Sequence, residues 1–128
     1  MPEINIPDVL AEVTEAFRRY EVALTTNDIA VLDELFKDAP YTVRYGATEI
    51  LYGYAEIQAF RASRPGQGLQ RTLERTLITT FGRDFATAST LFRRVPGKIG
   101  RQQQTWVRFA EGWRVVAAQV SLMDEPKS

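Results

Sequence analysis

Apolar residues near the start of the chain repeat at the spacing of a helix. Between Asp8 and about Thr25 they recur every three or four positions, at Leu10, Val13, Phe17, Tyr20 and Leu24. Such a stripe covers one face of a helix, so this range is predicted to be a helix with one buried side. Pro7 suits the first turn of that helix, where a missing N–H costs nothing.

Two shorter helices and a small strand pair are expected next. Asn27 can cap a second helix, and the segment YAEIQAFRAS predicts a third helix that ends at the Pro-Gly pair 65–66. Between these helices, YTVRYG at 41–46 is rich in residues that favour strands, and EILYG at 49–53 completes a hairpin.

The pattern changes to alternation after the third helix. Four segments alternate apolar and polar residues with a period of two: Leu69–Phe81, Asp84–Val95, Arg101–Phe109 and Trp113–Met123. This period predicts four long antiparallel strands joined by short turns. The result is an α+β fold in which a strongly curved sheet holds three helices in its concave face and leaves an open cavity. We expect one domain over 1–128, with loose termini at 1–6 and 124–128.

Composition narrows the chemistry that this cavity can perform. The 128 residues include no cysteine and no histidine, which excludes disulfides, thiolate chemistry, imidazole metal sites and a histidine base. Neither a metal nor an organic cofactor is implied. Sixteen basic residues balance sixteen acidic ones, which argues against nucleic-acid binding. No segment resembles a signal peptide or a membrane span, so a soluble cytoplasmic protein is expected.

Two polar residues stand among apolar ones in the first half of the chain. Arg44 lies in the middle of the strand 41–46, and an arginine is seldom buried without a partner. It therefore either points to water or meets an anionic group. Tyr20 lies on the buried stripe of the first helix, as a core tyrosine with a satisfied hydroxyl or as a residue that faces the cavity.

The third strand carries two arginines on a face that it shares with leucines. Counting by two from Leu69 places Arg71 and Arg75 beside Leu73 and Leu77. Their aliphatic stems can cover the sheet while the charged ends reach solvent, which suits Arg71, near the strand start, better than Arg75. Arg75 is therefore a candidate ligand-binding residue.

The last hairpin adds glutamines whose orientation depends on the turn. A two-residue turn at 111–112 places Gln104 opposite Gln119, on the side that also carries Trp106. A three-residue turn with a bulge brings Gln103 to Gln119 instead. The last strand has no clearly solvated face, which either a second copy of the protein or a central place in a small sheet would explain. A homodimer is expected on this ground.

The order of elements and the closing segment GRQQQTWVRFAEGWRVVAAQVSLMD resemble the nuclear transport factor 2-like superfamily. More narrowly, the chain resembles the AtzH-like proteins, which accompany amidases in the bacterial catabolism of carboxylated ureas and related nitrogen compounds. The resemblance implies a pocket tyrosine from the first helix and an arginine from the first strand, and Tyr20 and Arg44 occupy these places. Gln119 departs from the many superfamily members that carry a histidine there, so a mechanism with that base does not transfer.

The resemblance also implies a small enzyme that acts on a carboxylated urea-type compound. The reaction would be decarboxylation or decarboxylating amide hydrolysis, for example of 1,3-dicarboxyurea to allophanate. Arg44 would bind a carboxylate, and Tyr20 would donate a hydrogen bond or a proton. The remaining candidate substrate-binding residues are Arg75, Gln104, Trp106 and Gln119.

A second class of function involves no turnover. Hydrolysis requires a base, and the sequence places neither of the nearest carboxylates, Asp28 and Glu49, inside the site. The protein could instead bind a small ligand, or support a neighbouring amidase. An isomerase or dehydratase for apolar ring substrates fits less well, because its pocket would be mostly apolar and these candidates are arginines and amides.

Overall fold

A computed structural model describes residues 1–126 of the chain. The elements follow one another in the order α1 (Pro7–Thr25), α2 (Ile29–Leu35), β1 (Val43–Tyr45), β2 (Ile50–Tyr52), α3 (Tyr54–Ser63), β3 (Thr72–Phe81), β4 (Phe85–Arg93), β5 (Lys98–Phe109) and β6 (Gly112–Asp124). The expected helices, hairpin and long strands are therefore present, within a few residues of their expected limits.

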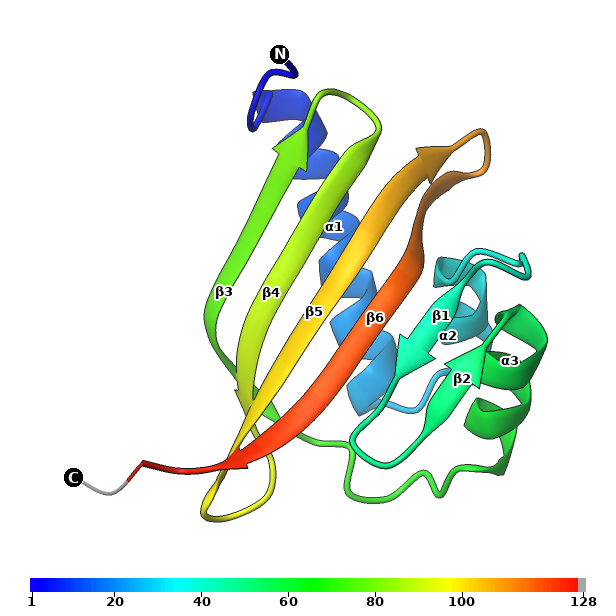
Figure 1. The fold of residues 1–128 in the computed structure, drawn as a ribbon, viewed down its shortest axis with the longest axis vertical. Coiled ribbons are helices and arrows are strands. Elements are labelled where there is room, and N and C mark those ends of the chain that lie inside the picture. Colours follow the sequence, from blue (N-terminus) through cyan, green and yellow to red (C-terminus); the bar gives the residue numbers. More distant parts are fainter. Residues whose placement is uncertain (127–128) are drawn as a thin grey trace.

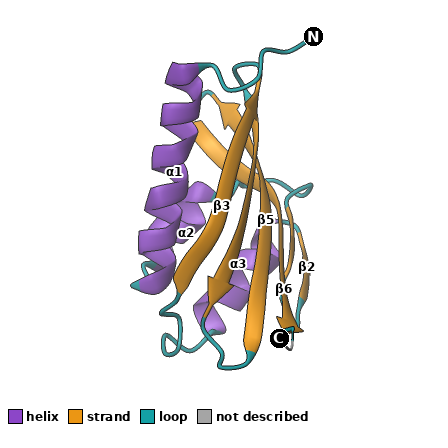
Figure 2. Cartoon of the chain, turned by 90° about the vertical axis from the view of Figure 1, so that its left-hand side faces the viewer, coloured by secondary structure: helices purple, strands orange, loops and turns teal. Residues whose placement is uncertain are grey.

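The strands form one sheet in the order β2-β1-β6-β5-β4-β3. Neighbouring strands are antiparallel except β1 and β6, which run parallel. The long strands curve, and the helices lie on one side of the sheet, as Figures 1 and 2 show. The expected α+β fold, with helices against a curled and mostly antiparallel sheet, is confirmed.

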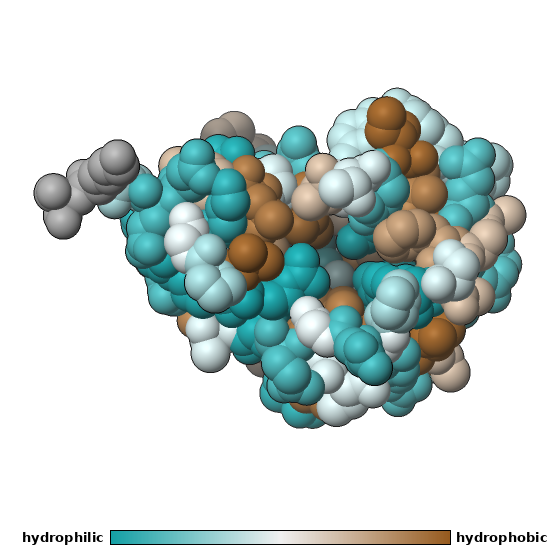
Figure 3. Space-filling view, turned by 90° about the horizontal axis from the view of Figure 1, so that it is seen from below, coloured by the Kyte–Doolittle hydropathy of each residue, from teal (hydrophilic) through white to brown (hydrophobic). Residues whose placement is uncertain are grey.

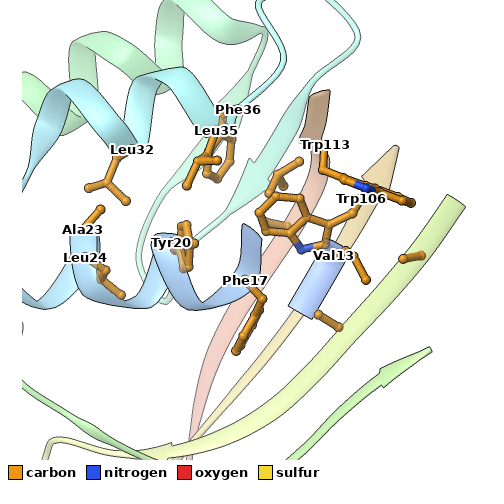
Figure 4. Close-up of a cluster of buried hydrophobic side chains, with 14 of the residues drawn as sticks. Val13, Phe17, Tyr20, Ala23, Leu24, Leu32, Leu35, Phe36, Trp106 and Trp113 are labelled. Carbon is orange, nitrogen blue, oxygen red and sulfur yellow. The ribbon is translucent and has the colours of Figure 1, made fainter. Parts of the chain in front are cut away.

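The predicted apolar stripe fixes α1 on the sheet. Val13, Phe17 and Tyr20 are buried in one cluster with Trp106 of β5 and Val115 of β6 (Figure 4). Burying one large apolar side chain contributes roughly 1.5–3 kcal/mol, so several of them along one helix face dominate its docking.

The cap of α2 differs by one residue from the expectation. Asp28, not Asn27, precedes the helix, and its Oδ1 accepts a hydrogen bond from the N–H of Val31 at 3.3 Å. Asn27 has a φ of 54°, a left-handed conformation that asparagine tolerates better than most residues, and it forms the turn after α1. Both side chains can cap a helix, and the backbone decides which of them does.

The β5–β6 hairpin settles the register of the glutamines. The turn occupies residues 110–111, and a β-bulge after Thr105 shifts the pairing by one residue. Gln103 consequently pairs with Gln119, the pairing that the alternative with a bulge predicts, although the turn has two residues and not three. The register with Gln104 opposite Gln119 is wrong because it places the turn at 111–112, one residue too late, and omits the bulge.

A second bulge interrupts β3. Its register with β4 shifts between Glu74 and Leu77, where Arg75 has a φ of 52°. A bulge inserts one residue and turns the following side chains to the other face of the sheet. Arg71 lines a cavity beside the helices, whereas Arg75 and Leu77 line a groove on the outer face. The prediction that the two arginines share a face is wrong.

Both ends of the described chain are tied to strand ends. The N–H of Asn5 donates to the Thr80 carbonyl at 3.1 Å, and Asn5 Oδ1 accepts from the Thr80 N–H at 2.8 Å. The N–H of Glu125 donates to the Gly97 carbonyl at 3.0 Å. These bonds hold Asn5 and Glu125 in place, the expectation of loose termini stays a prediction for the rest of 1–6 and 124–126, and residues 127–128 lie outside the described residues.

Candidate functional site

A cavity of about 290 Å³ lies between α1, the β1–β2 turn and the helix-facing side of the sheet. Figure 3 looks onto this end of the molecule, where the surface is hollowed. Ligand cavities commonly measure roughly 300–1,000 Å³, so the size suits a small compound. Tyr20 and Arg44 both line the cavity, which is where the family resemblance places them.

Arg44 reaches the cavity from β1, where it pairs with the small Ala118 of β6. Its Nη1 donates to Oε1 of Glu49 at 2.7 Å, and its guanidinium lies 5.6 Å from the centre of the Phe60 ring. The side chains of Arg44 and Glu49 are only 11% and 18% exposed. Arg44 thus meets a carboxylate of its own chain, while its other N–H groups can serve a ligand.

Glu49 is a carboxylate of the cavity, a position that no pattern in the sequence indicates. Burial alone would raise its pKa, but hydrogen bonds from Arg44 and Thr48 outweigh burial and hold the pKa below its ordinary value. The Thr48 hydroxyl donates to Oε2 at 2.8 Å, so both carboxylate oxygens are bound. A carboxylate held this way is a weak base. The other candidate base, Asp28, caps α2.

Tyr20 projects from α1 between the helices and the sheet, next to Phe36 (Figure 4). The hydroxyl of Tyr54 shows how a tyrosine is satisfied in this fold, because it donates to the Asp33 carbonyl at 2.9 Å. The Tyr20 hydroxyl has no such partner among residues 1–126, and the residue lines the cavity. It can therefore donate to a bound ligand.

Arg71 and Gln102 form a bound pair on the wall of the cavity. Nε and Nη2 of Arg71 donate to the two oxygens of Glu21 at 2.9 and 2.7 Å, and Nη2 also donates to Gln102 Oε1 at 3.0 Å. The Phe92 ring lies under the guanidinium, with its centre 4.6 Å away. The amide nitrogen of Gln102 is buried and has no partner in the described chain, which leaves a donor for a ligand.

Arg64 is a cavity residue that sequence reasoning missed. It follows the last residue of α3, where an arginine is ordinary because it complements the helix dipole. Its Nε and Nη2 are buried without a hydrogen-bond partner in residues 1–126. Burial, and then the nearby charge of Arg44, lower the pKa of its guanidinium. No local signal in the sequence distinguishes this arginine from a solvated one.

The sheet separates the candidate residues into two groups. Gln104 and Trp106 are buried on the helix side, where the indole Nε1 donates to Gln104 Oε1 at 3.1 Å, but they do not line the cavity. Arg75 and Gln119 line a groove of about 500 Å³ on the opposite face. The structure therefore brings Tyr20 and Arg44 together and places the other four candidates elsewhere.

The charges around the cavity favour an anionic ligand. Four arginines line it: Arg44, Arg64, Arg71 and Arg94. Within the described part of the chain, the carboxylates bound to them are Glu49 and Glu21, which leaves two positive charges without a carboxylate partner there. Guanidinium groups bind carboxylates and phosphates in a planar, bidentate way, and either group on a small ligand would suit this wall.

The described residues contain neither a candidate metal site nor a membrane-spanning helix. Within residues 1–126, no group of three or more acidic side chains is arranged to hold a metal ion. In the same part of the chain, no helix has the length and apolar character needed to cross a bilayer.

The sequence matches the AtzH-like family over residues 2–126. Among solved structures, a protein with unknown function from the DUF3225 family of Pectobacterium atrosepticum is 63% identical, and the match covers 94% of this chain and 95% of that one with a TM-score of 0.93. A cystatin-like fold protein from Burkholderia xenovorans is 46% identical over 98% of this chain and 100% of its own, with a TM-score of 0.94.

More distant structures share the fold alone. A nuclear transport factor 2-like protein of unknown function from Pseudomonas putida is 18% identical, with 94% of this chain and 97% of that one covered and a TM-score of 0.78. No curated protein matches the sequence significantly.

Proposed function

The chain belongs to the AtzH-like family, and from that premise we propose that its cavity binds a small carboxylated urea-type compound and removes carbon dioxide from it. The observation that carries the proposal is the surplus of two positive charges in a small cavity that also holds the Tyr20 hydroxyl. A dianion such as 1,3-dicarboxyurea would balance this surplus. Loss of one carboxylate as carbon dioxide, with uptake of one proton, would leave allophanate.

The proposed step breaks the bond between a urea nitrogen and its carboxylate carbon. The bonding electron pair stays on nitrogen, the carbon leaves as carbon dioxide, and nitrogen takes one proton. Tyr20 donates this proton and regains one from water. Arg44 holds a neighbouring oxygen of the substrate by charged hydrogen bonds, which keeps the nitrogen beside the hydroxyl.

The state of Glu49 favours decarboxylation over hydrolysis. Hydrolysis needs a base that takes a proton from water, and Arg44 and Thr48 occupy both oxygens of Glu49 and lower its pKa. Glu21, the other carboxylate next to the wall, is bound by Arg71. Decarboxylation requires an acid and no base, and the Tyr20 hydroxyl can supply it.

Binding without turnover is the second candidate function. The observation that favours it is that arginines bind the two carboxylates next to the cavity, so no strong base within residues 1–126 faces the ligand. Such a protein could hold a product of a neighbouring amidase, or support that amidase, in nitrogen-compound catabolism.

One experiment separates the two functions. Purified protein is mixed with freshly prepared 1,3-dicarboxyurea, and carbon dioxide and allophanate are followed against the spontaneous rate. Saturable acceleration supports the enzyme, and saturable binding by calorimetry without acceleration supports the binding protein. Neither acceleration nor binding would remove both proposals.

A further inference from the structure

One edge of the Arg64 guanidinium is built for a carboxylate and has no partner in the described chain. This edge consists of Nε and Nη2, which are both buried. Arg71 shows how the same edge works on the same cavity wall, because its Nε and Nη2 bind the two oxygens of Glu21 at 2.9 and 2.7 Å. No carboxylate of residues 1–126 is hydrogen-bonded to Arg64 in this way.

Leaving this edge unpaired is unfavourable for the protein alone. A buried donor without a partner has lost its hydrogen bonds to water and gained none in exchange, and the cost is larger when the donor is charged. Burial and the charge of Arg44 lower the pKa of Arg64, which reflects the same cost. Perturbed groups of this kind cluster at functional sites.

We propose that Arg64 binds one carboxylate of the ligand through this edge while Arg44 binds the other. The inference rests on the proposed function and names Arg64 as a further substrate-binding residue of the same site. Glu49 already balances the charge of Arg44, but Arg44 keeps further N–H donors in the cavity that Tyr20 also lines. Arg64 then provides the principal unbalanced charge for the ligand.

Arg94 is the other cavity arginine without a carboxylate partner in the described chain, and it is a weaker candidate. Its Nη1 lies 3.5 Å from the Gly68 carbonyl, and the residue is exposed. An exposed guanidinium is solvated and gains less from binding an anion than a buried one does. The burial of its donors therefore singles out Arg64.

The test compares a dicarboxylate with a monocarboxylate on matched variants. Calorimetry with malonate and acetate is run on wild type, Arg64→Gln and Arg83→Gln. The control removes one positive charge at the β3–β4 turn, at the opposite end of the molecule from the cavity (Figure 1), where Arg83 is exposed beside Asp8. We expect wild type and the control to bind malonate more tightly than acetate. Arg64→Gln should lose at least about tenfold in malonate affinity, which corresponds to ~1.4 kcal/mol, and should no longer prefer malonate to acetate, because one carboxylate-binding arginine is left.

The melting temperature separates a ligand-binding role from a structural one. Removing a buried charge without a partner should leave the melting temperature of Arg64→Gln unchanged or higher. A lower melting temperature with unchanged malonate affinity would assign Arg64 to the structure and overturn the inference, as would wild-type malonate binding by a stable variant.

Failure of the proposed reaction has a different signature. If wild type binds malonate through Arg64 but does not accelerate loss of carbon dioxide from 1,3-dicarboxyurea, the two-carboxylate site stands and the decarboxylase does not. If turnover is found but is insensitive to Arg64→Gln, the decarboxylase stands and the assignment of Arg64 to the substrate does not.

Discussion

Arg44 Nη1 and Glu49 Oε1 lie 2.7 Å apart inside the cavity and join β1 to the turn before β2. The arginine in the middle of the first strand is thus neither solvated nor reserved for a ligand alone. Part of its charge is balanced by its own chain, and the remainder faces the cavity. This arrangement determines what each substitution at the pair should do.

Arg44→Lys should weaken ligand binding while leaving the fold intact. Lysine keeps the charge next to Glu49 but cannot bind two groups in the planar geometry of a guanidinium. We expect malonate affinity to fall by roughly 1.5–3 kcal/mol, the value of a charged hydrogen bond, as measured by calorimetry. Unfolding in urea is the control. A strongly destabilised variant with intact affinity would make Arg44 a purely structural partner of Glu49.

Tyr20→Phe should separate chemistry from binding. The variant removes one oxygen that has no partner in residues 1–126, so the free energy of unfolding should change by less than the ~1 kcal/mol of a net hydrogen bond. If the hydroxyl donates the proton, turnover of 1,3-dicarboxyurea should fall by roughly 10²–10⁴-fold in steady-state kinetics. Affinity for malonate should fall much less. Undiminished turnover in a well-folded variant would return Tyr20 to the role of a core residue.

The stability of the protein should decrease at acid pH, and part of this decrease should depend on Glu49. Its pKa is lower in the folded state than in the unfolded chain, so the ionised form stabilises the fold. This contribution is complete above the ordinary glutamate pKa of about 4.3 and is lost as the pH falls through the lower folded value. Wild type should therefore exceed Glu49→Gln in urea midpoint at pH 7, and the difference should shrink on acidification. A difference that is constant between pH 7 and pH 3 would contradict this assignment.

The outer face of the sheet should form a homodimer. The helices cover only the other face (Figure 2), and the groove of about 500 Å³ on the outer face contains Leu77, which is 66% exposed, beside Gln103 and Gln119. Glutamine side chains that meet their copies across a two-fold axis can form hydrogen bonds with one another, and Leu77 is stabilised when it is buried. Sedimentation at micromolar concentration should show twice the chain mass of 14.5 kDa.

Leu77→Glu should then yield monomers, because it places like charges across the two-fold axis. Val22→Glu is the matched control, since Val22 is 49% exposed on α1, away from the outer face. A wild type that sediments as a monomer would exclude this interface.

The sequence determined the elements and their order. Helical spacing from 8 to 25 and alternation from 69 onward report on which face of each segment is apolar, and burial of that face is what forms the segment. The resemblance also brought out Tyr20 and Arg44, which line one cavity in the structure, while their proposed roles await the experiments above.

Tertiary structure decided which side of the sheet each later residue occupies. Counting by two holds only along an unbroken ladder, and the bulges near Arg75 and after Thr105 reverse the count. Tertiary structure also singled out Arg64, whose side chain is ordinary in the sequence. Its significance comes from burial without a partner, a property that depends on every neighbour brought close by folding and on no local pattern.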